Sequence, residues 1–157
     1  MDITIRRAAE SDIPELDRLL YQVHKVHSDI RPDLFVPGAK KYTDGELAEI
    51  LKDDDTPVFV AEREDRVAGY AFCIIKTAGG SPSLTDIKTL YIDDLCVDET
   101  VRGGHIGTAL YEYVLEFARS IGCYNVTLNV WEGNDAAMRF YEKIGMKVQK
   151  TGMEKIL

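Results

Sequence analysis

Apolar and polar residues follow two different periods along the chain, and each change of period marks an expected helix or strand. Apolar residues at helical spacing occur in four stretches: 13–23, 47–51, 106–121 and 137–144. Alternating apolar positions predict strands near residues 3–5, 58–63, 67–76, 87–98 and 126–130, and a last extended segment from Met146 to Ile156. This order of elements predicts a mixed α/β fold.

Several polar residues and glycines fix the expected helix ends. Thr43 and Glu46 have the spacing of a capping box, in which each side chain bonds the backbone N–H of the other residue. Asn134 is expected to cap the last helix. Gly122 and Gly145 follow the third and fourth helical stretches, where glycine commonly ends a helix.

The strand near residues 87–98 contains a change of phase. Leu90 and Ile92 share one parity, whereas Leu95 and Val97 share the other, and the Asp93-Asp94 pair lies between them. Since side chains alternate strictly between the two faces of a strand, this change predicts a one-residue β-bulge. A bulge bends the strand and leaves backbone groups unpaired at that point.

A glycine-rich turn, Arg102-Gly103-Gly104-His105-Ile106-Gly107-Thr108, follows this strand and opens the third helix. Backbone N–H groups at a helix N-terminus are unpaired and lie at the positive end of the helix dipole, which favours a phosphate or pyrophosphate. The string is neither a Walker loop nor a dinucleotide-binding fingerprint, because Arg102 stands where the latter needs its first glycine.

Composition narrows the class of protein. The 157 residues fit one domain, 1–157, and an apolar content of 45% suits a globular core. Three widely separated cysteines predict reduced thiols and a cytoplasmic location rather than a disulfide framework or a zinc site. A net charge of −8 and the lack of a long apolar run argue against nucleic-acid and membrane partners.

Two strings resemble the GNAT superfamily of acetyl-CoA-dependent N-acetyltransferases. Arg102 to Gly107 resemble its pyrophosphate loop, written R/Q-x-x-G-x-G/A, and residues 129–146 resemble its last strand-turn-helix. His105 stands where the family usually has its middle glycine, so it must keep helical dihedrals or point away from the ligand. The resemblance implies one twisted, mostly antiparallel sheet of about seven strands with about four helices, and a splayed parallel strand pair that forms the CoA cleft.

The resemblance also assigns roles to residues. Leu95, Cys96 and Val97 would pair with the pantetheine arm, and Arg102 to Thr108 would hold the pyrophosphate of acetyl-CoA. The remaining donor contacts would come from Asn134, Ala137 and Phe140. No metal is expected. Arg31, Phe35 and Tyr42 would contact the acceptor, and a homodimer is a family-based expectation.

Acetyl transfer to an amine needs a proton acceptor for the amine and a proton donor for the departing thiolate. By resemblance, the hydroxyl of Tyr141 is the donor. Alternation places one carboxylate of the Asp93-Asp94 pair on the cleft side and favours Asp93, with Asp94 or a water-mediated route as alternatives. A covalent role for Cys96 is disfavoured, because no histidine lies near it in the sequence.

The sequence therefore predicts an N-acetyltransferase that acetylates a primary amine of a small molecule or peptide by direct attack in a ternary complex. A non-catalytic acyl-CoA-binding sensor on the same fold is the first alternative, and an unrelated nucleotide-binding α/β protein is the second. Only the enzyme requires both Tyr141 and a carboxylate at the cleft. Neither composition nor resemblance identifies the acceptor.

Overall fold

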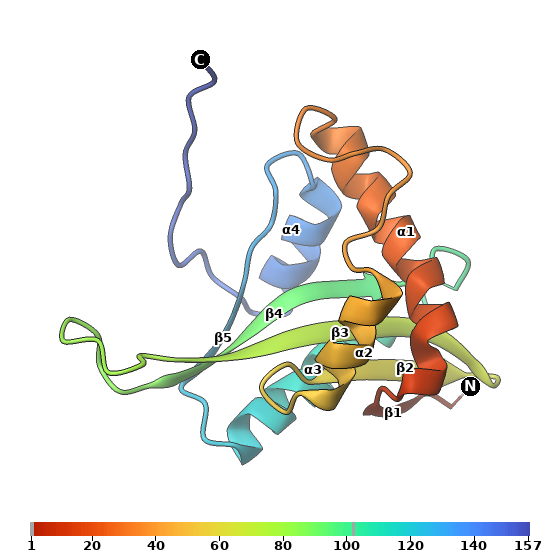
Figure 1. Ribbon diagram of the computed structural model, residues 1–157, viewed down its shortest axis with the longest axis horizontal. Helices are drawn as coiled ribbons and strands as arrows, with labels where there is room; N and C mark the ends of the chain where they lie inside the picture. Colours follow the sequence, from red (N-terminus) through yellow and green to blue (C-terminus); the bar gives the residue numbers. More distant parts are fainter. Residues whose placement is uncertain (1, 102) are drawn as a thin grey trace.

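The computed structural model describes residues 2–101 and 103–157, and Figure 1 shows its single sheet with helices on both sides. Its strands lie in the order β1-β2-β3-β4-β5. They are β1 (Thr4–Arg7), β2 (Val58–Arg63), β3 (Arg66–Thr77), β4 (Lys88–Val97) and β5 (Asn125–Leu128). The helices are a 3-10 turn, η1 (Glu10–Asp12), and α1 (Ile13–Ile30), α2 (Asp44–Lys52), α3 (Ile106–Ser120) and α4 (Asp135–Lys143).

Each face of the sheet has its own hydrophobic core. Leu16, Leu19 and Leu20 of α1 and Leu47 of α2 pack on one face with the alternating strand residues Val58, Val60, Tyr70 and Phe72. Ile106, Leu110 and Val114 of α3 pack on the other face with Phe59, Ala61, Ala71, Cys73, Leu90 and Ile92. Because neighbouring strand residues point to opposite faces, β2 and β3 are buried on both sides.

The predicted capping residues are found in place. The Thr43 hydroxyl accepts a hydrogen bond from the Glu46 N–H at 3.1 Å, and the Glu46 carboxylate accepts one from the Thr43 N–H at 3.0 Å. Asn134 Oδ1 accepts a hydrogen bond from the Ala137 N–H at 3.4 Å at the start of α4. Gly145 ends that helix with a φ of 104°, a left-handed conformation that glycine adopts without steric cost.

The predicted bulge in β4 is also confirmed. The register of β3 and β4 shifts between the pairs Phe72–Asp94 and Cys73–Ile92, so Asp93 is the extra residue. Beyond the bulge, β4 continues to Val97, whereas β5 ends at Leu128, its last paired residue. The two parallel strands therefore separate just beyond Ile92, where the expected cleft lies.

The expected count of about seven strands is wrong for the described part of the chain. The sheet has five strands. Residues 146–157 are extended but join no strand of the sheet, and Figure 1 shows this segment leaving the body of the protein. Alternation in the sequence marks an extended segment but cannot supply the neighbouring strand that makes it part of a sheet.

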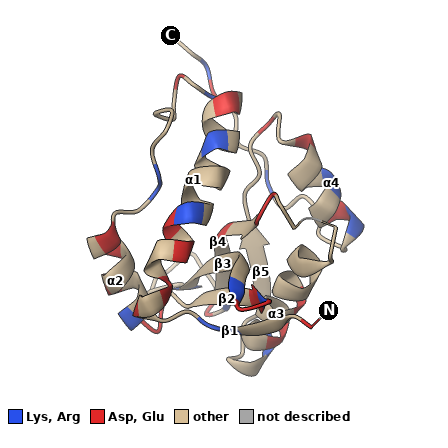
Figure 2. Cartoon of the chain, turned by 90° about the vertical axis from the view of Figure 1, so that its right-hand side faces the viewer, with Lys and Arg blue, Asp and Glu red and all other residues tan. Residues whose placement is uncertain are grey.

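Charged residues of both signs lie along α1 (Figure 2), and one end of this helix approaches the cleft. Within residues 2–101 and 103–157, no helix is both long and apolar enough to cross a membrane.

Candidate functional site

A cavity of about 650 Å³ opens where β4 and β5 separate. Its floor is the bulged part of β4, and its walls come from α1, the loop before α2, the turn after β5 and the start of α4. The lining residues used below are His24, His27, Phe35, Lys41, Tyr91, Asp93, Asp94, Leu95, Trp131, Asn134, Ala137 and Tyr141. The volume lies within the usual range for small-molecule sites.

Both carboxylates of the bulge face this cavity. The expectation that only one of them would do so is wrong, because strict alternation fails at the extra residue of a bulge. Asp93 Oδ2 accepts a hydrogen bond from the Tyr42 hydroxyl at 2.5 Å and lies 3.0 Å from Lys41 Nζ. Asp94 Oδ2 accepts a hydrogen bond from the Tyr70 hydroxyl at 2.7 Å.

The two carboxylates differ in their electrostatic surroundings. Burial raises the pKa of Asp94 to about 6, and the neighbouring charge of Asp93 acts in the same direction. Lys41 forms an ion pair with Asp93 rather than with Asp94. At neutral pH Asp94 is thus a carboxylate whose pKa lies close to the ambient pH, as efficient general base catalysis requires.

Tyr141 of α4 lines the same cavity. Burial raises the pKa of its phenol above the ordinary value of 10, and the negative charge of Asp94 adds to this effect. The ring of Tyr141 packs edge-on against Phe140 and Tyr111, with centroid separations of 5.1 and 6.5 Å. The phenol is therefore held protonated at neutral pH and fixed in orientation.

The start of α3 forms the second part of the site. His105 is its N-cap residue and has φ 60° and ψ 22°, a left-handed conformation. Its side chain is exposed and makes no capping hydrogen bond within the described chain. The first N–H groups of α3 therefore lack a side-chain cap, which suits an anionic ligand. Arg102 itself lies outside the described residues.

The first alternative expected for His105, helical dihedrals, is wrong, because its backbone is left-handed. A non-glycine residue in this region costs about 1–3 kcal/mol of strain, whereas glycine adopts it freely. We expect His105→Gly to raise the free energy of unfolding by about 0.5–1 kcal/mol, after allowance for the larger entropy of unfolded glycine. Urea titration measures this change. His105→Ala retains the strain and should give no increase.

The other predicted donor residues lie around the same cleft. Gly107 is close to α4, because a Cβ atom there would lie 3.3 Å from the Phe140 ring and 3.5 Å from Val97. Leu95, Asn134 and Ala137 line the cavity. Thr108 belongs to the first turn of α3.

Three of the predicted donor residues are not among those that line the cavity. Gly103 and Gly104 precede α3, and Gly103 has a φ of 94°. Cys96 is buried under α1, where its thiol donates to the Leu19 carbonyl at 3.7 Å. This position gives Cys96 a packing role in the core.

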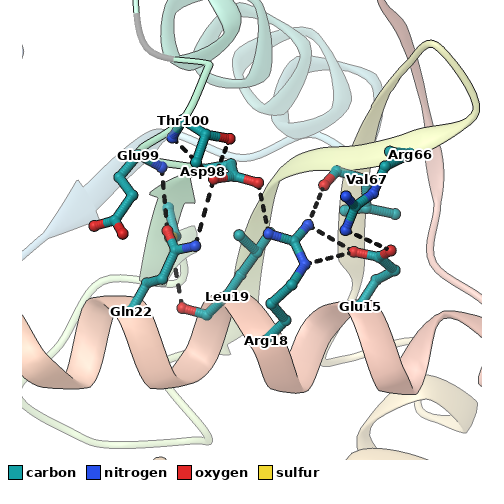
Figure 3. Close-up of polar contacts among 10 residues, drawn as sticks. Glu15, Arg18, Leu19, Gln22, Arg66, Val67, Asp98, Glu99 and Thr100 are labelled. Atoms are coloured by element: carbon teal, nitrogen blue, oxygen red, sulfur yellow. Dashed lines mark hydrogen bonds and ion pairs between the residues drawn. The ribbon is translucent and has the colours of Figure 1, made fainter.

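A polar network around the buried Asp98 carboxylate anchors the segment that leads into this turn (Figure 3). The Asp98 carboxylate accepts hydrogen bonds from Arg18 Nη1 at 2.5 Å, from the Thr100 N–H at 3.0 Å and from Gln22 Nε2 at 3.4 Å. In return, Gln22 Oε1 accepts the Glu99 N–H at 3.1 Å. Two residues of α1, one helical turn apart, therefore fix the backbone of residues 98–100.

Sequence reasoning missed this network. The one signal for it in the sequence is Asp98, an acidic residue directly after the bulged strand. The partners of Asp98, Arg18 and Gln22, are more than seventy positions away in the sequence.

Removal of the Asp98 charge should destabilise the protein. Asp98→Asn weakens its charge-assisted bond to Arg18, and we expect the free energy of unfolding to fall by about 2 kcal/mol at pH 7. Although burial acts in the opposite direction, hydrogen bonds from Thr100 and Arg18 hold the pKa of Asp98 well below its usual range. The contribution is therefore fully present above about pH 4 and is lost as the pH falls further.

Urea titrations of wild type and variant at pH 7 and pH 3 test this prediction. Glu15→Gln is the matched control, because Glu15 pairs with Arg18 from the more exposed side. It should cost under about 1 kcal/mol. Equal losses for the two variants would contradict a special role for Asp98.

An aromatic cluster lines part of the cavity. Phe35, in the loop before α2, packs at right angles to Trp131 with a centroid separation of 5.4 Å. It also lies 5.7 Å from the His24 ring and 5.4 Å from the His27 ring. The cluster joins the loop before α2 to the turn after β5.

The predicted acceptor residues are thus only partly brought together. Phe35 lines the cavity, Tyr42 lies behind Asp93, and Arg31 pairs with Asp33 and Glu154 instead. Among the described residues, no three His, Cys, Asp or Glu side chains are grouped so that they could hold a metal ion.

Comparison with known proteins places this arrangement in a family. The model of the acetyltransferase (GNAT) family matches residues 21–146. The chain is 33% identical over 101 residues to glucosamine 6-phosphate N-acetyltransferase of Trypanosoma brucei brucei, which covers 62% of the chain and 63% of that protein. It is 28% identical to mouse thialysine N-epsilon-acetyltransferase over 153 residues, 90% of the chain and 82% of the relative.

The fold has a close counterpart among solved structures. The crystal structure of a mutant protein from Bacillus halodurans superimposes with a TM-score of 0.93 at 32% identity, over 98% of this chain and 99% of that one. The chain spans 63% of the length of the Trypanosoma relative, and 60% of the length of an uncharacterized N-acetyltransferase of Methanocaldococcus jannaschii. The family match, the splayed strands and the glycine turn agree, and the chain belongs to the acetyltransferase (GNAT) family.

Proposed function

We propose that this protein binds acetyl-CoA and transfers the acetyl group to a primary amine of a small molecule or peptide, by direct attack in a ternary complex. One observation carries the proposal. Asp94 and Tyr141 line the same cavity, at the point where β4 and β5 separate. One group is suited to accept a proton at neutral pH and the other to donate one.

The residues around the cleft suit the donor. The start of α3 offers backbone N–H groups without a side-chain cap among the described residues, as a pyrophosphate requires. Beyond the last β4–β5 pair, the backbone of β4 around Leu95 has no β5 residue opposite it. Its N–H and C=O groups are therefore available to the amide groups of a pantetheine arm. Gly107 keeps the helix start free of side-chain bulk next to Phe140. Acetyl-CoA, when bound there, supplies a thioester as the acyl donor.

Two proton transfers follow from the positions of the side chains. The acceptor reaches the cavity mainly as an ammonium ion, because alkylamines have pKa values near about 10. Asp94 accepts a proton from the amine nitrogen, directly or through water, and so frees the lone pair that attacks the acyl carbon. When the carbon–sulfur bond breaks, the Tyr141 hydroxyl donates its proton to the departing sulfur, and the second proton that the nitrogen loses on becoming an amide passes through solvent to restore the phenol.

The remaining groups of the cavity give the acceptor side a fixed charge and an apolar surface. Asp93 is held by Tyr42 and Lys41 and acts as a fixed charge beside Asp94. The Phe35–Trp131 pair gives the outer wall an apolar surface for the carbon skeleton of the acceptor. The relatives named above acetylate amino groups by name, which supports an amine acceptor for this chain as well.

Ligand-dependent stability tests the donor assignment. At about one hundred times its dissociation constant, acetyl-CoA should raise the free energy of unfolding by roughly 2.7 kcal/mol. NAD and ATP at equal concentration should have no such effect, since their motifs do not occur in the chain. Thermal unfolding with each ligand measures the shift, and equal stabilisation by NAD would refute the assignment.

A further inference from the structure

We propose that Arg63, the last residue of β2, is a positioning residue of the donor site. Its guanidinium holds the Gly103-Gly104 part of the turn before α3 in shape and supplies a fixed positive charge next to the phosphates of acetyl-CoA. The inference rests on the proposed function for the identity of the donor. Neither the family motif that begins at Arg102 nor the lining of the cavity includes Arg63.

Arg63 contacts the turn at a glycine. A Cβ atom on Gly104 would lie 2.8 Å from Arg63 Nη1 and 3.8 Å from Arg63 Cζ. Since the first distance is far below a normal contact between non-bonded heavy atoms, the guanidinium occupies the place where a side chain at residue 104 would begin. The backbone of Gly104 does not itself require glycine, because its φ is not positive. The contact with Arg63 therefore explains the glycine at this position.

The glycine pair is the part of the turn that most needs an outside contact. Residues 98–100 are fixed by their hydrogen bonds to α1, and α3 begins at Ile106. Gly103 and Gly104 have no side chains with which to pack, and glycine loses more conformational entropy on ordering than any other residue. A turn that presents backbone N–H groups to a ligand binds more tightly when it is ordered in advance. Arg63 supplies a contact that favours this order.

The topology of the sheet brings Arg63 to the turn from a distant part of the sequence. β2 and β3 form a tight hairpin in which Arg63 pairs with Arg66, and β3 pairs in turn with β4. Because β3 is antiparallel to both neighbours, β2 and β4 end at the same end of the sheet, where Val97 leads into the turn. Arg63 is partly buried there, so its charge is held in place.

Charge gives the contact a second consequence. The chain has a net charge of −8 and the donor carries anionic phosphates, so the body of the protein repels the donor unless positive charge lies near the phosphates. The Arg63 guanidinium touches Gly104, two residues before the helix start at which we propose that the pyrophosphate binds. Since arginine stays charged throughout the usual pH range, its attraction for the donor is constant.

Calorimetric titration of the full chain with acetyl-CoA tests the proposal without any acceptor. Arg63→Gln should raise the dissociation constant about tenfold, and Arg63→Lys should recover part of the loss because it retains the charge. Arg66→Gln is the matched control, because it removes an arginine from the same hairpin. Arg66 pairs with Glu15 of α1 instead (Figure 3), so its loss should change the dissociation constant less than about twofold.

Gly104→Ala removes the same contact from the other side. Its Cβ atom would displace the guanidinium, which is the far end of a flexible side chain, so the protein should stay folded. The dissociation constant should rise by a factor similar to that of Arg63→Gln. Because both substitutions remove one contact, the double variant should bind no more weakly than either single variant. Circular dichroism and thermal unfolding without ligand confirm that each variant is folded.

The salt dependence of binding separates a charged contact from mere support of the fold. As NaCl rises from about 50 to about 300 mM, the dissociation constant should rise more steeply for the wild type than for Arg63→Gln, which lacks one screened attraction. Wild-type affinity in Arg63→Gln, equal salt dependence of the two proteins, or additive losses in the double variant would each overturn the inference and leave donor binding intact. A wild type that does not bind acetyl-CoA would overturn the donor assignment and this inference with it.

Discussion

Tyr141→Phe should lower turnover with a good acceptor by about 10²- to 10⁴-fold, the usual contribution of general acid catalysis. The substitution keeps the ring and its contacts with Phe140 and Tyr111 but removes the proton donor. Folding and the affinity for acetyl-CoA should therefore remain near those of the wild type. Steady-state release of free thiol, together with ligand-dependent thermal unfolding, measures both quantities.

Tyr111→Phe is the matched control for this experiment. Tyr111 is also a largely buried phenol and lies against Tyr141, but it does not line the cavity. Its loss should change turnover less than about threefold. Since the pKa of Tyr141 lies above 10, the wild type should also show no loss of rate between pH 7 and pH 9. Full activity of Tyr141→Phe would remove its assigned role.

Asp94→Asn should lower kcat/KM by a similar factor, about 10²- to 10⁴-fold, and should at the same time make the protein more stable. The wild-type kcat/KM should fall as the pH drops through about 6, where Asp94 becomes protonated. The amide retains an oxygen that can accept the Tyr70 hydrogen bond, so the core should be little disturbed. Asp93→Asn is the matched comparison, and a larger loss of activity for that variant would make Asp93 the base, as strand alternation favours.

The stability gain has a defined sign and pH range. Because the folded-state pKa of Asp94, about 6, exceeds the ordinary 3.8, the folded protein binds the proton more tightly than the unfolded chain. Ionisation of Asp94 therefore costs stability progressively from about pH 4 to pH 6, and the full cost remains at pH 7. Asp94→Asn removes that cost, which amounts to about 2–3 kcal/mol. Urea titrations should show the gain at pH 7 and none at pH 4.

Local patterns predicted much of this fold correctly. The phase change between Ile92 and Leu95 located the bulge, because burial enforces strict alternation everywhere else in β4. The Thr43–Glu46 box and the Asn134 cap were equally local, since each depends on residues within one helical turn.

Features that depend on distant partners were not predictable in this way. The bonds from α1 to Asp98 join residues that only the folded chain brings together. Strand alternation favoured Asp93 over Asp94, but the electrostatic difference between them arises in the folded chain, from the burial of Asp94 and from the contacts of Asp93 with Lys41 and Tyr42. The same holds for residues 146–157, which the sequence predicts to be extended but which join no strand of the described sheet.

The left-handed conformation of His105 is a third case. A histidine at the start of a helix predicts no such dihedrals, because residues other than glycine adopt them only rarely.

The most direct test of the account combines acetyl-CoA with a panel of primary amines, including amino sugars, amino acids, polyamines, aminoglycosides and lysine peptides. Free thiol and the mass of the acetylated product are followed together, with the wild type and Tyr141→Phe side by side. At least one amine should yield thiol and acetylated product in equal amounts, and the variant should nearly abolish both. Tight binding of acetyl-CoA without any acetylated amine across the panel would contradict catalysis and would favour a sensor of acyl-CoA on the same fold.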